Sequence, residues 1–117
     1  MQNERKRLLI LLNDKHFASI IAKTANSHGF DAKICDSAQD AKLRLKKDRY
    51  CGIIIDADAL LQMQRTKSVR SIPIFALSNG ADSKLVSKIR ELGVKEHYFY
   101  GHIRPSELIK HITAITQ

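Results

Sequence analysis

Two unbroken runs of apolar residues organise the chain. One is Ile53–Ile55, which lies between Gly52 and Asp56, and the other lies within Arg7–Leu12. A run without alternating polar positions predicts a strand that is buried on both faces, as is typical of the central strands of a parallel sheet. We therefore expect these two segments to form the middle of a sheet that is covered by helices on both sides.

Shorter segments predict three more strands, at Asp31–Cys35, Ile72–Leu77 and Glu96–Tyr100. Between the strands, apolar residues recur at helical spacing, and capping residues and glycines mark the helix ends. The predicted helices run from Lys15 to His28, from Ala38 to near Asp48, from Asp82 or Ser83 to Leu92, and from Pro105 onward. Between Ala57 and Ser71 the apolar residues show only a weak helical spacing, and only a short helix around Leu60 is expected.

Strands that alternate with helices predict a parallel α/β sheet with right-handed crossovers. For five strands, the flavodoxin-like order 2-1-3-4-5 is the natural arrangement. No linker or repeat interrupts the 117 residues, so we expect residues 1–117 to form a single domain. This domain either stands alone or is the amino-terminal part of a longer protein.

The composition, with 44% hydrophobic and 27% charged residues, is that of a globular domain. No apolar run is long enough to cross a membrane, and the run after Arg7 is too short for a signal peptide, so we expect a cytoplasmic protein. Cys35 ends one predicted strand and Cys51 begins another, which places them too far apart for a disulfide. Both are interpreted as reduced, half-buried thiols.

The net charge of +8 is compatible with a nucleic acid or an acidic protein as a partner. The densest basic group, Lys42–Arg49, is not interleaved with aromatic residues, and its five cations cannot share one helix face. This pattern is typical of solvated helix surfaces and disfavours a nucleic-acid-binding module, which remains as an alternative. The five histidines show no spacing typical of a metal site.

Polar residues follow three of the predicted strands at their carboxyl ends. Asp56 follows the central apolar run, Asn13 and Asp14 follow the first strand, and Ser78 follows the fourth. In the order 2-1-3-4-5 the first and third strands face one crevice, and such crevices bind ligands. Because burying an unpaired carboxylate is costly, Asp56 predicts a site there, although it could also serve only as a turn cap.

With these residues in place, the chain resembles the receiver domain of bacterial response regulators (CheY-like proteins) over nearly its whole length. Asp56 falls on the phosphoacceptor aspartate of that family, and Ser78 falls on its switch serine or threonine. Gly29-Phe30, Ile72-Pro73-Ile74 and Gly93 match further landmarks. The resemblance implies a domain of two-component signal transduction or a phosphorelay, which works by recognising other proteins.

The acidic pocket of the family is degenerate in this sequence. Receivers carry two adjacent acidic residues after the first strand, which hold a divalent cation. Here the matching pair is Leu12-Asn13, with Asp14 one position late and Asp58 just beyond Asp56. Mg²⁺ requires oxygen ligands in octahedral geometry, which leucine cannot supply. We therefore expect no cofactor and no metal ligands, and Mg²⁺ binding is doubtful.

The resemblance also places two other functional positions. The family's lysine after the fifth strand falls on Tyr100 or Gly101, with His102 and Arg104 as the nearest cations. The aromatic switch position falls on His97 or Tyr98. The segment after Asp56 is shorter than the family usually has, so the third helix is expected to be shortened and to leave part of the sheet exposed.

An enzyme interpretation remains open as a weaker alternative. Asp56-Ala57-Asp58, followed by Ser78-Asn79, resembles the first two motifs of haloacid-dehalogenase-type phosphatases, in which one aspartate is the nucleophile and the other the general acid. Lys84 could match the lysine of those enzymes, but no acidic pair follows the last strands. We therefore expect that the protein is not an enzyme.

The sequence thus predicts a degenerate receiver domain that acts through protein–protein interaction without phosphorylation of Asp56. A receiver that is phosphorylated at Asp56 with a rearranged metal site is the main alternative. The family's usual partner surface is formed by the fourth helix, the fifth strand and the last helix. We expect this surface to bind an acidic protein partner or to form a weak homodimer. It would present four cations, which are Lys88, Arg90, Lys95 and Lys110.

Overall fold

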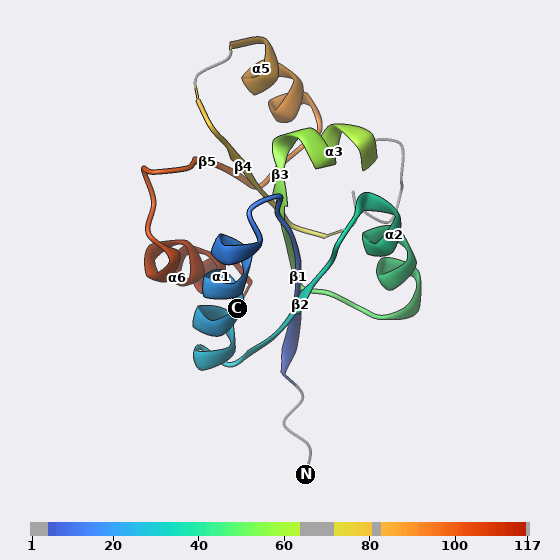
Figure 1. Cartoon of the computed structure of the whole chain (residues 1–117), viewed down its shortest axis with the longest axis vertical. Coiled ribbons are helices and arrows are strands. Elements are labelled where there is room, and N and C mark those ends of the chain that lie inside the picture. The colour runs from blue at the N-terminus through green and yellow to red at the C-terminus, as the bar shows by residue number, and fades with distance from the viewer. Residues whose placement is uncertain (1–4, 64–71, 81–82, 117) are drawn as a thin grey trace.

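The computed structural model describes residues 5–63, 72–80 and 83–116. Its strands are β1 (Lys6–Leu11), β2 (Phe30–Ile34), β3 (Gly52–Asp56), β4 (Ile74–Ser78) and β5 (Glu96–Phe99). Its helices are α1 (Lys15–Ser27), α2 (Ala38–Lys47), α3 (Ala57–Met63), α5 (Ser83–Glu91) and α6 (Pro105–Thr116). Figure 1 shows the sheet in the middle of the molecule, with α1 and α6 on one side and α2 on the other.

The strands form one parallel sheet in the order β2-β1-β3-β4-β5, which confirms the predicted topology. β1 and β3 lie next to each other, with Leu9 opposite Ile53 and Leu11 opposite Ile55. Their carboxyl ends therefore reach the same edge of the sheet. No helix in the described part of the chain is long and apolar enough to span a membrane.

Both faces of the central strands are buried, which explains why their sequences do not alternate. Ile54 and Phe75 pack with α1 and α6 in one hydrophobic cluster, whereas Ile53 and Ile55 pack with α2, α3 and α5 in the other. These side chains have no exposed surface. Burial of a complete isoleucine side chain contributes about 1.5–3 kcal/mol, so the two clusters supply much of the stabilisation of the fold.

The helix starts follow the capping residues that the sequence offers. Asp14 caps α1, and its Oδ1 accepts a hydrogen bond from the backbone N–H of Phe17 at 3.0 Å. Ser37 caps α2 in the same way, with the N–H of Asp40 at 3.1 Å. Gly29 follows α1 with a φ of +92°, a conformation that side chains with a Cβ rarely adopt.

The third helix is short, as predicted, with seven residues in α3. The expectation that a short helix would leave part of the sheet exposed is wrong for the described strands. Ile53, Ile55 and Ile74 on that face are buried, and Leu60 and Met63 of α3 pack into the same cluster. Even two helical turns are sufficient here because the apolar residues of α3 face the sheet.

The cysteines are free thiols, as predicted, but only one of them is half-buried. Cys51 is partly exposed, whereas Cys35 is completely buried in the cluster beneath α2. Burial, reinforced by the negative charge of Asp40, raises the pKa of Cys35 to about 11. Cys35 is therefore an unreactive core residue, because the thiolate is the nucleophilic form.

Candidate functional site

A crevice opens at the carboxyl ends of β1, β3 and β4. It has a volume of about 620 Å³. Its polar lining comes from the last residues of the strands and from the segments that follow them, and consists of Asn13, Asp14, Asp56, Asp58, Ser78, Asn79 and Tyr100. The structure thus brings together most of the residues that the sequence singled out for the crevice. The exception is Leu12, which is buried against α1 and α6 and points into the core.

Asp56 lies at the base of the crevice, and its exposed fraction is only 6%. The backbone N–H of Asn13 donates a hydrogen bond to its Oδ2 at 2.5 Å, and the hydroxyl of Tyr100 donates one to its Oδ1. Each carboxylate oxygen therefore has a donor, which satisfies the requirement for burying this charge.

Tyr100 reaches Asp56 because of the turn that follows β5. Its own N–H donates to the carbonyl of Ser78 at 2.9 Å, and Gly101 next to it has a φ of +82°. The ring of Tyr100 stands edge-on to that of Phe17, with the centroids 5.4 Å apart. Of the two candidates for the lysine position, Tyr100 is the one that contacts Asp56, whereas Gly101 shapes the turn.

The hydroxyl of Tyr100 is held in its neutral, proton-donating form. Burial raises its pKa, and the hydrogen bond to Asp56 raises it further. The negative charges of Asp56 and Asp14 act in the same direction. Tyr100 therefore serves as a hydrogen-bond donor without charge at the position where a lysine would place a cation.

Ser78 is directed away from Asp56. Its Oγ lies 2.8 Å from Nε2 of His97, and only 6% of Ser78 is exposed. Burial lowers the pKa of His97, which favours the neutral imidazole as the partner of the hydroxyl. The hydroxyl of Ser78 therefore pairs with His97 on the next strand, β5.

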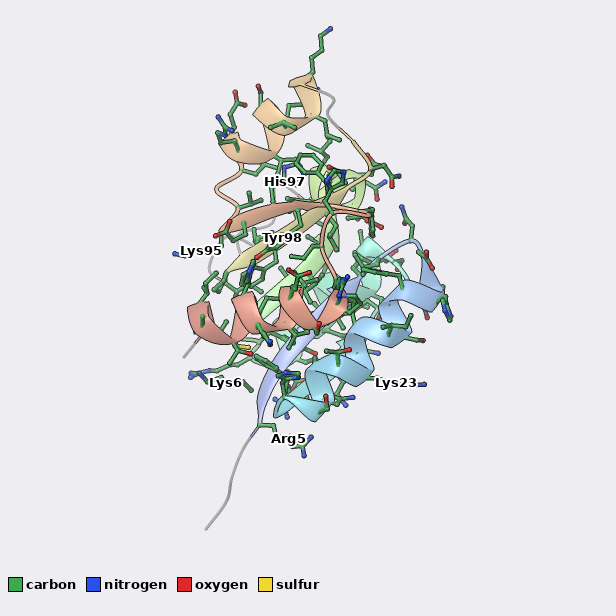
Figure 2. All side chains as sticks on the ribbon, turned by 90° about the vertical axis from the view of Figure 1, so that its left-hand side faces the viewer. Arg5, Lys6, Lys23, Lys95, His97 and Tyr98 are labelled. Atoms are coloured by element: carbon green, nitrogen blue, oxygen red, sulfur yellow. The ribbon has the colours of Figure 1, made fainter. Side chains whose placement is uncertain are left out.

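The two candidates for the aromatic switch position lie on opposite faces of β5 (Figure 2). His97 contacts Ser78, and its ring lies at a tilt of 36° to that of Phe99, with the centroids 4.9 Å apart. Tyr98 packs against α6, where its hydroxyl lies 3.4 Å from Nδ1 of His111. Of these two candidates, His97 is therefore the one that contacts Ser78. The sequence could not distinguish them because strand boundaries decide which face a residue takes.

The cations nearest to Tyr100 in the sequence lie outside the crevice. His102 lies beyond the turn, with its ring near that of Phe99, and the backbone of Arg104 bonds Glu107 at 3.3 Å. Neither residue lines the crevice. Lys84, the candidate lysine of the phosphatase alternative, is the second residue of α5 and also lies outside the lining. The described lining of the crevice thus contains carboxylates but no lysine, arginine or histidine.

The carboxylate oxygens in the crevice are not arranged as ligands of Mg²⁺. Both oxygens of Asp56 accept hydrogen bonds, and Oδ1 of Asp14 caps α1. Asp58 is exposed on α3. Within the described ranges, no group of three histidine, cysteine or acidic residues is arranged to hold a metal ion. Because Mg²⁺ demands nearly ideal octahedral oxygen geometry, this arrangement is a poor site for it.

The cations of the predicted partner surface are all exposed. Lys88 and Arg90 belong to the last turn of α5, Lys95 precedes β5, and Lys110 lies on α6. Arg90 and Lys95 line a small hollow of about 190 Å³ together with Glu96. The four cations are therefore spread over adjacent elements rather than gathered in one cluster.

Comparison with solved structures shows the fold of the chain. A CheY-like receiver domain from Methanospirillum hungatei JF-1 matches with a TM-score of 0.82 at 12% identity, covering 97% of this chain and 94% of that one. HP1043, an orphan response regulator of H. pylori, matches with a TM-score of 0.84 at 21% identity, covering 96% and 97%. The receiver domain of Francisella response regulator 1452 gives 0.80 at 19% identity, with 95% and 96% covered.

No family model matches the sequence, and a search of curated proteins finds no significant match. The structural matches nevertheless span nearly the whole chain in both directions. The fold of this chain is therefore that of CheY-like receiver domains.

Proposed function

From this receiver fold, we propose that the chain is a degenerate receiver domain that acts in cytoplasmic signal transduction through protein–protein contacts. Phosphorylation of Asp56 does not drive it. The observation that carries this proposal is the state of Asp56, whose two oxygens accept hydrogen bonds from Asn13 and from neutral Tyr100. The aspartate thus has a structural role in holding the first, third and fifth strands together at the crevice.

Charge supports the same proposal. Transfer of a phosphoryl group requires that the negative charge on its oxygens be neutralised, usually by a metal ion and a cationic side chain. The described crevice lining offers three carboxylates, Asp14, Asp56 and Asp58, and no cation. An incoming phosphoryl donor would be repelled, and Oδ1 of Asp56 would have to exchange its bond to Tyr100 before it could attack.

We expect incubation with acetyl phosphate or phosphoramidate and Mg²⁺ to leave the protein unmodified. Intact-mass spectrometry gives the readout, with Asp56→Asn as the matched control. A gain of one phosphoryl group that is absent from Asp56→Asn would overturn the proposal and establish the alternative, a phosphorylatable receiver with a rearranged metal site. A gain that persists in Asp56→Asn would identify modification elsewhere and leave the proposal intact.

The partner surface is proposed to be formed by α5, β5 and α6. It carries Lys88, Arg90, Lys95 and Lys110, and the acidic residues Glu91, Glu96 and Glu107 lie on the same elements. In a two-fold dimer the same patch faces itself, so a surface with charges of both signs can be self-complementary. Its excess of cations also suits an acidic protein as an alternative occupant.

Charge reversal of Lys88 and Arg90 to glutamate is expected to weaken self-association about tenfold, which corresponds to roughly 1.4 kcal/mol. Sedimentation velocity at low salt, over a range of concentrations, measures the dissociation constant. Reversal of Lys42 and Lys46 on α2 is the matched control, since it changes the net charge equally on a helix that lies outside the proposed surface. If the two double variants change the dissociation constant equally, or if neither changes it, the self-association surface lies elsewhere.

A further inference from the structure

A second hollow lies at the amino ends of the strands, opposite to the Asp56 crevice. It has a volume of about 600 Å³. We call it the amino-end groove, and its lining is Arg5, Lys6, Arg7, Asp31, Arg49, Tyr50 and Cys51. Figure 2 shows Arg5 and Lys6 at the end of the molecule remote from His97.

The parallel sheet brings these cations together from two separate segments. Arg5 precedes β1, Lys6 and Arg7 are its first two residues, and Arg49 precedes β3, the neighbour of β1 in the sheet. The backbone N–H of Cys51 donates to the carbonyl of Arg7 at 2.8 Å, which fixes the two segments side by side. The groove is therefore part of the rigid sheet rather than a property of one loop.

One of the four cations in the groove is already paired within the fold. Nε of Arg7 lies 3.8 Å from Asp31, and its Nη1 lies 3.7 Å from Asp48. Asp31 is shared with Lys33, whose amine is 3.6 Å away. Arg7 and Lys33 thus balance the two carboxylates, and this network has no net charge.

Among the residues that the structure describes, the other three cations have no carboxylate partner. Arg5 contacts the carbonyl of Phe30 at 3.5 Å, and Lys6 contacts the carbonyl of Thr116, but both of these acceptors are neutral groups. Arg49 is exposed and forms no ion pair with any residue in the described part of the chain. A hollow lined by unbalanced charges of one sign raises the local concentration of an oppositely charged ligand.

We propose that the amino-end groove binds a carboxylate-rich segment of a protein partner. Guanidinium groups recognise carboxylates in a bidentate geometry, and Arg7 already contacts two carboxylates here. The groove offers no platform for stacking a nucleobase, because Tyr50, its one aromatic residue in the described lining, is 7% exposed. Its cations also lie in one compact hollow instead of a stripe that could follow a phosphate backbone.

Binding at this groove is independent of the state of Asp56, because the two sites lie at opposite ends of the strands. The proposal therefore adds a second surface to the domain and does not rest on the function proposed above. It also accounts for part of the excess positive charge, which neither the crevice nor the α5–β5–α6 surface explains.

The test is fluorescence anisotropy with a labelled oligoglutamate peptide, and with a labelled single-stranded oligonucleotide of equal net charge as the competing probe. We expect the peptide to bind and salt to weaken its binding. Arg49→Glu and Arg5→Glu should each reduce the affinity about tenfold, or roughly 1.4 kcal/mol. Asp56→Asn should leave the affinity unchanged, which separates this proposal from that for the crevice.

Arg104→Glu is the matched control, since it makes the same change of charge at an exposed position before α6, at the carboxyl end of the sheet and away from the groove. We expect it to reduce the affinity no more than about twofold, because screening limits the range of a surface charge to roughly 10 Å at moderate salt. Circular dichroism establishes that each variant is folded. Three results would overturn the proposal: no binding of the peptide, equal losses for Arg104→Glu and Arg49→Glu, or tighter binding of the oligonucleotide.

Discussion

Replacement of Asp56 by alanine is expected to lower the free energy of unfolding by about 1–3 kcal/mol, the range typical of lost hydrogen bonds to a charged group and of donors left unpaired. The variant removes the acceptor for both the N–H of Asn13 and the hydroxyl of Tyr100. Because the crevice is open to water, part of this loss is recovered by solvation. Urea denaturation, followed by circular dichroism, measures the change.

Two controls sharpen this prediction. Asp56→Asn keeps the shape of the side chain and one carbonyl acceptor, so it should cost less than Asp56→Ala. Asp58→Ala removes an exposed carboxylate that also lines the crevice, and it should change the stability by no more than about 1 kcal/mol. A neutral or stabilising effect of Asp56→Ala would mean that repulsion among the acidic residues dominates, and that Asp56 is poised for a cation.

The second large effect is expected for Tyr100→Phe, which should lower the free energy of unfolding by about 1–2 kcal/mol through loss of one charge-assisted hydrogen bond. The phenylalanine ring can keep the edge-on contact with Phe17. The loss of unfolding free energy in Tyr100→Phe therefore measures the contribution of the hydroxyl and its bond to Asp56, with little contribution from packing. Equal stability of the variant and the wild type in the same urea titration would show that the bond is not formed in solution.

The pH dependence provides a further check on Tyr100. Its pKa in the folded protein is raised by burial and by Asp56, above the value of about 10 that tyrosine has in an unfolded chain. The stabilising contribution of its hydroxyl is therefore complete below about pH 10 and falls as the pH rises further, because only the unfolded chain then releases the proton. The difference between wild type and Tyr100→Phe should shrink in alkali, and a difference that grows there would contradict this assignment.

The fold could be predicted largely from the sequence because its strongest signals are local. The apolar runs at Leu8–Leu12 and Ile53–Ile55 require burial on both faces, and this requirement fixes a central parallel pair. The strand ends were less certain. The fourth strand begins at Ile74 instead of Ile72, because Pro73 has no N–H to donate, although its carbonyl accepts a bond from Ile53 at 3.0 Å. The expected strand at Glu96–Tyr100 ends at Phe99.

The site was only partly predictable. Topology alone placed Asn13, Asp14, Asp56 and Ser78 at one edge of the sheet, and the structure confirms that they line one crevice. The hydrogen bonds depend on loop geometry that no local pattern encodes. Tyr100 and Asp56 are 44 positions apart, and their contact requires the turn at Gly101 as well as the register of β5. The preference of Ser78 for His97 depends on that register too.

The most direct test of the structural role of Asp56 is a double-mutant cycle of Asp56→Ala and Tyr100→Phe. If the two side chains stabilise the fold through their mutual hydrogen bond, the double variant should lose less stability than the sum of the single variants, with a coupling energy on the order of 1 kcal/mol. Additive effects, equal to the sum within about 0.5 kcal/mol, would contradict the proposal that Tyr100 holds Asp56.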